Sequence, residues 1–402
     1  MITRLQARNF KSLRDIDLEL GPLNVLVGPN MSGKSNILSA FRFLQEVVFP
    51  EGGAQGVGYA VAKHGGINEL VWKGEDRRDS IGTPISFGSP ISLAVEMIDD
   101  TQPDSKYKYE LRMISGAGDF VSLQSESLKL FRHDEEHDLI VHRQGVGWAK
   151  SADGRDLGSV GPPESSALER PLTGWEGNTF HEWLRTWRFY HLIPAAMKQS
   201  GPVSEGQMLA EDGHNLSAWL MWLQAHSAEA FGRVSEVLAD LFPEISSLKA
   251  IPTTDSRAYL VAKEKDLARV TRTFQMSDGF LALTALLSLI LAPTELAGTL
   301  ICIEEPENYL HPRLMETLVA LLRQVQQEGS ISKRPVTQIV FSTQSPYLVN
   351  QFSLDEVIWI EKKHGETKAF RPSSKTHIRK LVEDKELGLG DLMYSGALGN
   401  EK

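Results

Sequence analysis

The chain opens with an alternation of apolar and polar positions. This alternation predicts two short strands over residues 2–20, and the apolar run at 23–27 predicts a buried strand that stops at Gly28. Helical spacing of apolar residues follows over 36–48 and ends before Pro50. The glycine-rich stretch 52–58 predicts a loop. The amino-terminal pattern is therefore strand, tight turn and amphipathic helix.

Four further alternating segments lie between residues 85 and 146, and the turn signals between them predict an antiparallel meander. The segment 151–171 is rich in Gly, Pro and Ser, which indicates a mobile connector. Helical spacing returns over 178–190 and 215–241, and short strands are expected over 248–270. Four tryptophans in the helical segments are expected in the core: Trp183, Trp187, Trp219 and Trp222.

The last third of the chain alternates between helix and strand. Helices are predicted over 280–291 and 312–327, and strands over 299–303, 338–342 and 356–360. Such alternation is typical of an α/β sheet with parallel strands. We therefore divide the chain into an amino-terminal lobe with an antiparallel meander, an inserted helical subdomain and a carboxy-terminal α/β lobe, over residues 1–160, 161–247 and 248–402.

Composition places the chain among ordinary globular proteins. Its 402 residues are 41% hydrophobic and 23% charged, which excludes disordered and fibrous classes. Its one cysteine, Cys302, excludes an internal disulfide framework. The start lacks the apolar core of a signal peptide, and the most apolar stretch, 281–300, is broken by Pro293 and Glu295. We expect a soluble cytoplasmic protein that makes no membrane contact.

The first motif with chemical content is a phosphate loop of the form G-x-x-x-x-G-K-S between the buried strand and the helix. Glycines let backbone N–H groups turn toward phosphate oxygens at the positive end of the helix dipole. Lys34 would bridge the β- and γ-phosphates, and the Ser35 hydroxyl would bind Mg²⁺. The expected ATP-binding residues are Gly28, Asn30, Ser32, Gly33, Lys34, Ser35 and Asn36.

A pair of carboxylates ends the strand predicted at 299–303. Glu304 and Glu305 would lie at the carboxyl edge of the sheet, where α/β proteins bind ligands. Glu304 could hold Mg²⁺ through water, and Glu305 could polarise the attacking water. On its own, such a pair of carboxylates also fits a solvated strand end. The presence of the phosphate loop in the same chain is what favours the catalytic interpretation.

Two shorter motifs complete the set. Ser277, Asp278 and Gly279 lead into a helix and are expected to contact phosphate, although Ser277 could equally be a simple N-cap. The segment 340–346 ends a strand in polar side chains, among which Gln344 is a candidate sensor of the γ-phosphate. A strand-to-helix turn would use similar residues.

The order of these motifs resembles the ABC-type ATPase heads of the SMC and RecF class, and most closely the OLD-like AAA-type ATPases of bacteria. The chain begins with Arg8-Asn9-Phe10-Lys11-Ser12-Leu13, which is similar to the start of those heads. Similar pieces follow at 306–312, 345–349, 390–392 and 395–396. The resemblance is tight over 1–50 and 270–402 and loose between them. It implies a P-loop head with two lobes, a mixed sheet, an antiparallel β lobe and an inserted helical subdomain.

The resemblance also implies that two copies sandwich two ATP molecules. Ser277 and Gly279 of one copy would contact the γ-phosphate held by Lys34 of the other. Glu304 stands where most such heads have Asp, and Gln344 stands where most have His. Glutamine can hydrogen-bond a phosphate but cannot take up a proton, so slow hydrolysis is expected. Gln55 is the one candidate found for the glutamine that these heads place after the first helix.

Two weaker clusters have ordinary explanations as well as functional ones. The segment 133–137 with His142 could bind a metal, but its position favours a solvated hairpin turn. The basic segment Lys362–Lys380 could bind nucleic acid or a partner, or it could be a solvated face.

We therefore expect an ATP- and Mg²⁺-dependent ATPase that forms a homodimer through the ATP sandwich. By resemblance it would gate a separate nuclease-like effector, in bacterial defence against phage. The alternatives are a RecF-like DNA repair ATPase that loads on DNA, and a scaffold that binds nucleotide without hydrolysing it.

Overall fold

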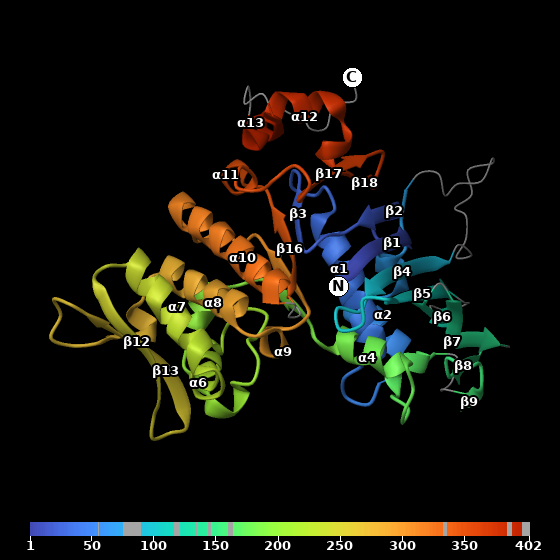
Figure 1. Ribbon diagram of the computed structural model, residues 1–402, viewed down its shortest axis with the longest axis horizontal. Helices are drawn as coiled ribbons and strands as arrows, with labels where there is room; N and C mark the ends of the chain where they lie inside the picture. The colour runs from blue at the N-terminus through green and yellow to red at the C-terminus, as the bar shows by residue number, and fades with distance from the viewer. Residues whose placement is uncertain are drawn as a thin grey trace. The chain divides into compact units, whose positions relative to one another are not determined.

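A computed structural model describes residues 1–54, 56–74, 90–115, 121–133, 135–143, 146–159, 164–332, 336–383 and 388–395 (Figure 1). The chain divides into two compact units. Unit 1 comprises Met1–Trp187, Leu354–Glu386 and Ser395–Lys402, and unit 2 comprises Arg188–Ser353 and Leu387–Tyr394.

Unit 1 contains an antiparallel sheet of eight strands in the order β2-β1-β4-β5-β6-β7-β8-β9. Its strands are β1 (Ile2–Phe10), β2 (Leu13–Glu19), β4 (Ile91–Ile98), β5 (Ser105–Ser115), β6 (Val121–Arg132), β7 (Glu135–Arg143), β8 (Val146–Lys150) and β9 (Asp156–Ser159). The predicted meander is confirmed and is longer than expected, because β8 and β9 extend it.

A second set of strands in unit 1 carries the phosphate loop. β3 (Leu23–Val27) pairs in parallel with β17 (Val357–Lys363), and β17 pairs antiparallel with β18 (Glu366–Phe370). Every residue of β3 is buried, as a strand flanked on both faces requires. The helices of unit 1 are α1 (Lys34–Val48), α2 (Gly56–Lys63), α3 (Ile67–Leu70), η2 (Ala167–Glu169), α4 (Gly177–Arg185), η5 (Pro372–Ser374) and α12 (Thr376–Glu383).

Unit 2 combines a parallel pair of strands with a small antiparallel sheet. Its strands are β11 (Gly201–Pro202), β12 (Ile245–Pro252), β13 (Arg257–Glu264), β14 (Thr271–Arg272), β15 (Leu300–Glu304) and β16 (Gln338–Thr343). Its helices are α5 (Pro194–Met197), η3 (Val203–Glu205), α6 (Leu216–His226), α7 (Ala228–Leu241), η4 (Thr273–Gln275), α8 (Asp278–Leu291), α9 (Thr294–Ala297), α10 (Pro312–Ser332), α11 (Pro346–Val349) and α13 (Leu389–Tyr394). Parallel pairs and flanking helices confirm the predicted mixed α/β class.

Two expectations about local structure were wrong. The stretch 52–58, expected as a loop, contains the start of α2 at Gly56. A Cβ there would lie 1.9 Å from the Val47 carbonyl oxygen, so only glycine permits this close packing. The helix expected over 178–190 ends at Arg185, and β10 (Trp187–Tyr190) follows at the division between the units. Gln45 Nε2 donates to the carbonyl oxygens of Leu184, at 2.7 Å, and Trp187, at 3.0 Å, where the helix ends.

The connector expected over 151–171 contains two short regular elements where the structure describes it, β9 and η2. Its anchor is Glu126 on β6, which is 1% exposed. The Glu126 carboxylate accepts hydrogen bonds from the Tyr109 hydroxyl at 2.8 Å, from the Ser166 hydroxyl, and from the Ala167 N–H at 2.8 Å. Burial raises the pKa of Glu126 above its ordinary value.

The predicted tryptophan core is confirmed for two of the four residues. Trp187 and Trp219 are buried, whereas Trp183 and Trp222 are half-buried. In the described part of the chain, no helix combines the length and the apolar character that crossing a bilayer requires.

Glu126 gives a prediction about stability. Replacing Glu126 with Leu leaves two hydroxyls and one N–H without their acceptor, and we expect the free energy of unfolding to fall by about 3 kcal/mol. A raised carboxyl pKa means that the native state binds the proton more tightly. The contribution of Glu126 is therefore full below pH 4.5 and declines as the pH rises through its native pKa.

Urea denaturation of the wild type and of Glu126→Gln, whose amide does not titrate, tests the direction of this pH dependence. The advantage of the wild type should shrink between pH 4 and pH 8. An advantage that grows over this range contradicts the account.

Candidate functional site

The phosphate loop of unit 1 is a tight turn that only glycine permits at two positions. A Cβ on Gly28 would lie 2.0 Å from the Ile360 carbonyl oxygen, and a Cβ on Gly33 would lie 2.0 Å from the Thr367 hydroxyl. Gly33 also has a φ of 109°, in the left-handed region. The loop therefore lies directly against β17 and β18.

A hydrogen-bonded brace holds this loop from behind. The Thr367 hydroxyl lies 2.9 Å from the Ser32 carbonyl oxygen and 2.6 Å from the Ser12 hydroxyl. Asn36 Nδ2 donates to Ser12 Oγ at 2.6 Å. Asn36, which we expected to bind nucleotide, thus contributes its side chain to the brace. Thr367 was missed, because no motif marks it.

Lys34 holds its ammonium against the backbone of the phosphate loop. It begins α1, it is 7% exposed, and its ammonium donates to the carbonyl oxygens of Gly28 at 2.7 Å and Pro29 at 3.0 Å. The ammonium therefore lies across the loop. Asn30 and Ser35 are exposed at the same turn. Ser32 Oγ is buried and has no hydrogen-bond partner within the described structure.

A cavity of about 590 Å³ adjoins the first turn of α1. Ser12, Asn36, Lys11 and Trp72 are among its lining residues. Lys11 Nζ lies 2.8 Å from Ser39 Oγ and 3.1 Å from His64 Nδ1, and His64 Nε2 lies 2.8 Å from a Glu46 carboxylate oxygen. A half-buried chain of polar side chains therefore positions a lysine beside the first two turns of α1.

The carboxylates of unit 2 stand at the end of a parallel strand pair. β15 and β16 are in register with Glu304 beside Ser342, so the residues after both strands meet at one edge. Gln344 Nε2 donates to Glu305 Oε1 at 3.3 Å, and Asn308 Nδ2 donates to Glu305 Oε2 at 2.9 Å. Two expected catalytic residues, 39 positions apart, are therefore in contact.

Glu305 holds a strained backbone conformation. Its φ is 47°, in the left-handed region that non-glycine residues rarely occupy. Its N–H donates to the Ser342 carbonyl oxygen at 2.8 Å, which fixes the chain there. Strain of this kind costs about 1–3 kcal/mol and persists where the surrounding structure enforces it, often at functional sites.

Glu307 holds the segment after β16 through hydrogen bonds, a role that was not predicted for it. The Thr343 hydroxyl and the Gln344 N–H both donate to Glu307 Oε1, the second at 3.3 Å. Burial raises the pKa of the Glu307 carboxyl, and its Oε2 has no hydrogen-bond partner in the described structure. The only sequence signal was the run of three glutamates around Pro306.

The expected phosphate contacts Ser277, Asp278 and Gly279 lie at the start of α8. The Ser277 hydroxyl accepts a hydrogen bond from the Phe280 N–H at 3.3 Å, so it is an N-cap of its own helix. Asp278 forms an ion pair with Lys198 at 2.6 Å. A Cβ on Gly279 would lie 2.8 Å from the Tyr309 carbonyl oxygen, which brings this helix start against the segment after Glu305.

The other sequence candidates are engaged differently. In the basic segment Lys362–Lys380, Lys363 pairs with Glu361 and Lys368 pairs with Glu366. Arg371 is structural, because its guanidinium donates to the Glu19 carbonyl oxygen and to Asn24 Oδ1, both at 2.8 Å. The segment around His133 is the turn between β6 and β7, and among the described residues no group of three metal-ligating side chains occurs. Gln55 and Gly396 lie outside the described residues.

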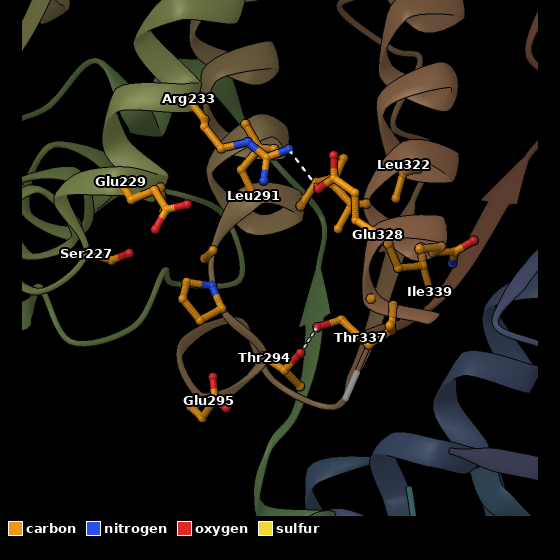
Figure 2. A pocket seen from close by; sticks show the side chains of 18 residues that line it. Ser227, Glu229, Arg233, Leu291, Thr294, Glu295, Leu322, Glu328, Thr337 and Ile339 are labelled. Carbon is orange, nitrogen blue, oxygen red and sulfur yellow. Dashed lines mark hydrogen bonds and ion pairs between the residues drawn. The ribbon is translucent and has the colours of Figure 1, made fainter. Parts of the chain in front are cut away.

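Unit 2 contains a separate cavity of about 440 Å³ (Figure 2). An ion pair between Arg233 on α7 and Glu328 on α10, at 3.4 Å, crosses it. Thr337, which also lines it, directly precedes β16, whereas Gln344 follows that strand. The cavity is therefore at the opposite end of β16 from the carboxylates.

These features fit a magnesium nucleotide. Gly28 and Gly33 carry no side chain where the loop turns, Lys34 supplies a cation, and Ser32 Oγ is a buried hydroxyl without a hydrogen-bond partner among the described residues. A hydroxyl oxygen, a kind of ligand that Mg²⁺ accepts, is present on Ser35 directly after Lys34.

Comparisons with known proteins agree with this interpretation. A family model described as an AAA ATPase domain matches residues 1–140. A second, described as an AAA domain, putative AbiEii toxin, Type IV TA system, matches residues 185–350. An OLD nuclease from Thermus scotoductus is 52% identical over 50 residues, which are 12% of this chain and 10% of that protein. The chain thus matches only a small part of that relative.

Two solved structures have a similar fold. One is an SMC head bound to the C-winged helix domain of ScpA, with a TM-score of 0.53 and 16% identity, over 92% of this chain and 96% of that one. The other is an SMC head with an extended coiled coil, bound to the C-terminal domain of ScpA derived from Pyrococcus furiosus. Its TM-score is 0.54 and its identity 14%, over 96% of this chain and 99% of the other. The chain thus has the fold of SMC heads, and its sequence is similar to AAA domains over residues 1–140 and 185–350.

Proposed function

We propose that this protein binds ATP with Mg²⁺, hydrolyses it slowly, and dimerises on ATP to gate a separate effector. The observation that carries the proposal is the contact between Glu305 and Gln344 at a strained strand end. A carboxylate held there by two amide donors is oriented to polarise a water molecule. The phosphate loop of unit 1, with the Lys34 ammonium on its backbone, is the proposed binding site for the phosphates.

In this proposal Lys34 binds the terminal phosphates, and Ser35 with Glu304 would hold Mg²⁺, which neutralises phosphate charge when bound. Ser277 of a second copy contacts the γ-phosphate from the positive end of α8, an attraction that is lost after hydrolysis. Gln344 donates a hydrogen bond but cannot accept a proton, which supports slow turnover. The similarity to an OLD nuclease supports a nuclease-like effector. The proposed role in defence against phage comes from the resemblance of the motifs to OLD-like ATPases.

Lys34→Ala tests nucleotide binding. A charge-assisted hydrogen bond contributes about 1.5–3 kcal/mol, so we expect ATP affinity to fall about 10- to 100-fold. Calorimetry with ATP and Mg²⁺ measures the dissociation constant, and Lys106→Ala, on the eight-stranded sheet, is the control. Equal affinity in Lys34→Ala and the wild type removes the phosphate-loop assignment.

Glu305→Gln tests hydrolysis. The amide keeps the shape of the side chain but cannot polarise water, so phosphate release should fall at least about 100-fold while ATP stays bound. Phosphate release and retained ATP are measured on the same sample, with Glu316→Gln, an exposed residue on α10, as the control. If turnover in Glu305→Gln matches the control, another group performs this step.

Two substitutions at Ser277 separate a helix cap from an intermolecular contact. Aspartate also caps a helix, so Ser277→Asp should keep the unfolding free energy within about 0.5 kcal/mol. Its charge would nevertheless repel the partner's γ-phosphate and abolish ATP-dependent dimers and turnover together. Ser277→Arg should lose the same activities and about 1 kcal/mol of stability.

Mixing Ser277→Arg with Lys34→Ala chains sharpens this test, because a mixed dimer retains one complete composite site. Partial recovery of ATPase activity supports the sandwich. A proven heterodimer as inactive as either parent opposes it.

A further inference from the structure

The small sheet of unit 2 has one covered face and one open face. Residues that lie opposite each other in antiparallel strands point to the same side. Leu248, Ala250, Leu260 and Ala262 form the buried side, and α6 packs on this sheet (Figure 1). The other side consists of Ser247, Lys249, Ile251, Arg257, Tyr259, Val261, Lys263 and Arg272. We call these eight residues the outer face.

The outer face carries cations and no carboxylate. The whole segment 245–275 has six Lys and Arg against three Asp and Glu, although the protein as a whole has a net charge of −10. Within the described chain, none of these six cations has a carboxylate within the 4.0 Å of an ion pair. Lys263 and Arg257 bond instead to the Leu267 carbonyl oxygen and to Ser200.

The large sheet of unit 1 shows the contrast. There Arg4 pairs with Asp17, Lys106 with Glu96 and Lys129 with Glu136, all across neighbouring strands. An antiparallel sheet readily places opposite charges beside each other. The outer face of unit 2 lacks this arrangement, so its positive charge is available to an external anion.

The spacing of the outer face suits a phosphate chain. Lys249 and Arg272 both lie opposite Val261, on the two neighbouring strands, which places them about 10 Å apart. Lys263 follows two positions along β13, about 7 Å farther. Tyr259 is half-buried in the middle of the face, with Ile251 directly opposite. An aromatic ring between cations provides a stacking surface for a base.

We propose that the outer face binds a single strand of nucleic acid, with its cations on phosphates and Tyr259 against a base. The aromatic and aliphatic centre favours unstacked bases over a closed duplex, whose bases are not exposed. This site is distinct from the segment Lys362–Lys380, where ion pairs and structural contacts engage much of the charge. It requires no nucleotide and is independent of the ATPase proposal.

Fluorescence anisotropy of the full chain without ATP tests this site. The probes are labelled (dT)20, labelled (rU)20 and a 20-base-pair DNA duplex, at 50–300 mM NaCl. We expect both single strands to bind more tightly than the duplex. The double variant Lys249→Gln/Arg272→Gln should weaken this binding at least about ten-fold. It should also lower the magnitude of the slope of log K against log[salt] by about 1.4, because each of the two lost phosphate contacts accounts for about 0.7 on a single strand.

The matched control is Lys129→Gln/Arg112→Gln, which removes the same charge from the unit 1 sheet. Tyr259→Ala should weaken binding about ten-fold with an unchanged salt slope, and Tyr259→Phe should restore it. Circular dichroism checks that each variant is folded. Equal losses in the two double variants, or a duplex preferred over single strands, overturn the proposal. Absence of binding by the wild type at 50 mM NaCl also overturns it and points to an acidic protein as the occupant.

Discussion

A hydrogen bond between the hydroxyls of Ser12 and Thr367 joins residues 355 positions apart and fixes the phosphate loop. Thr367 also bonds the loop backbone at Ser32, and Asn36 from α1 completes the brace. Both hydroxyls are buried, and a buried polar group that loses its partner costs about 1–3 kcal/mol. The cradle for phosphate thus depends on a strand near the carboxyl end of the chain.

The local geometry of the candidate site was predictable where neighbouring residues in the sequence determine it. The phosphate loop follows from the glycines and Lys34 between a buried strand and a helix. The contact of Glu305 with Gln344 follows from two strands that end in polar residues, because parallel pairing brings such ends together. The role of Thr367 could not be predicted, since it depends on the pairing of β17 with β3 across more than three hundred residues.

The predictions of local structure were wrong where tertiary contacts outweighed the local composition. Gly56 reads as a loop residue, yet close packing against Val47 places it in a helix. The helix before Trp187 ends where the Gln45 side chain donates hydrogen bonds to the Leu184 and Trp187 carbonyl oxygens. Hydrophobic periodicity does not reveal such a contact. Glu307 looked like one acid in an acidic run. Its burial and its bonds to the end of β16 became visible only in the fold.

The central claim is that the phosphate loop of one copy and the α8 start of another form one ATP site. The mass of the wild-type protein in solution, by light scattering during size-exclusion chromatography, tests it most directly. With Mg²⁺ and a non-hydrolysable ATP analogue, the account predicts twice the chain mass of 44.7 kDa, and with ADP it predicts one chain. A mass that is the same with the analogue, with ADP and without nucleotide would contradict it.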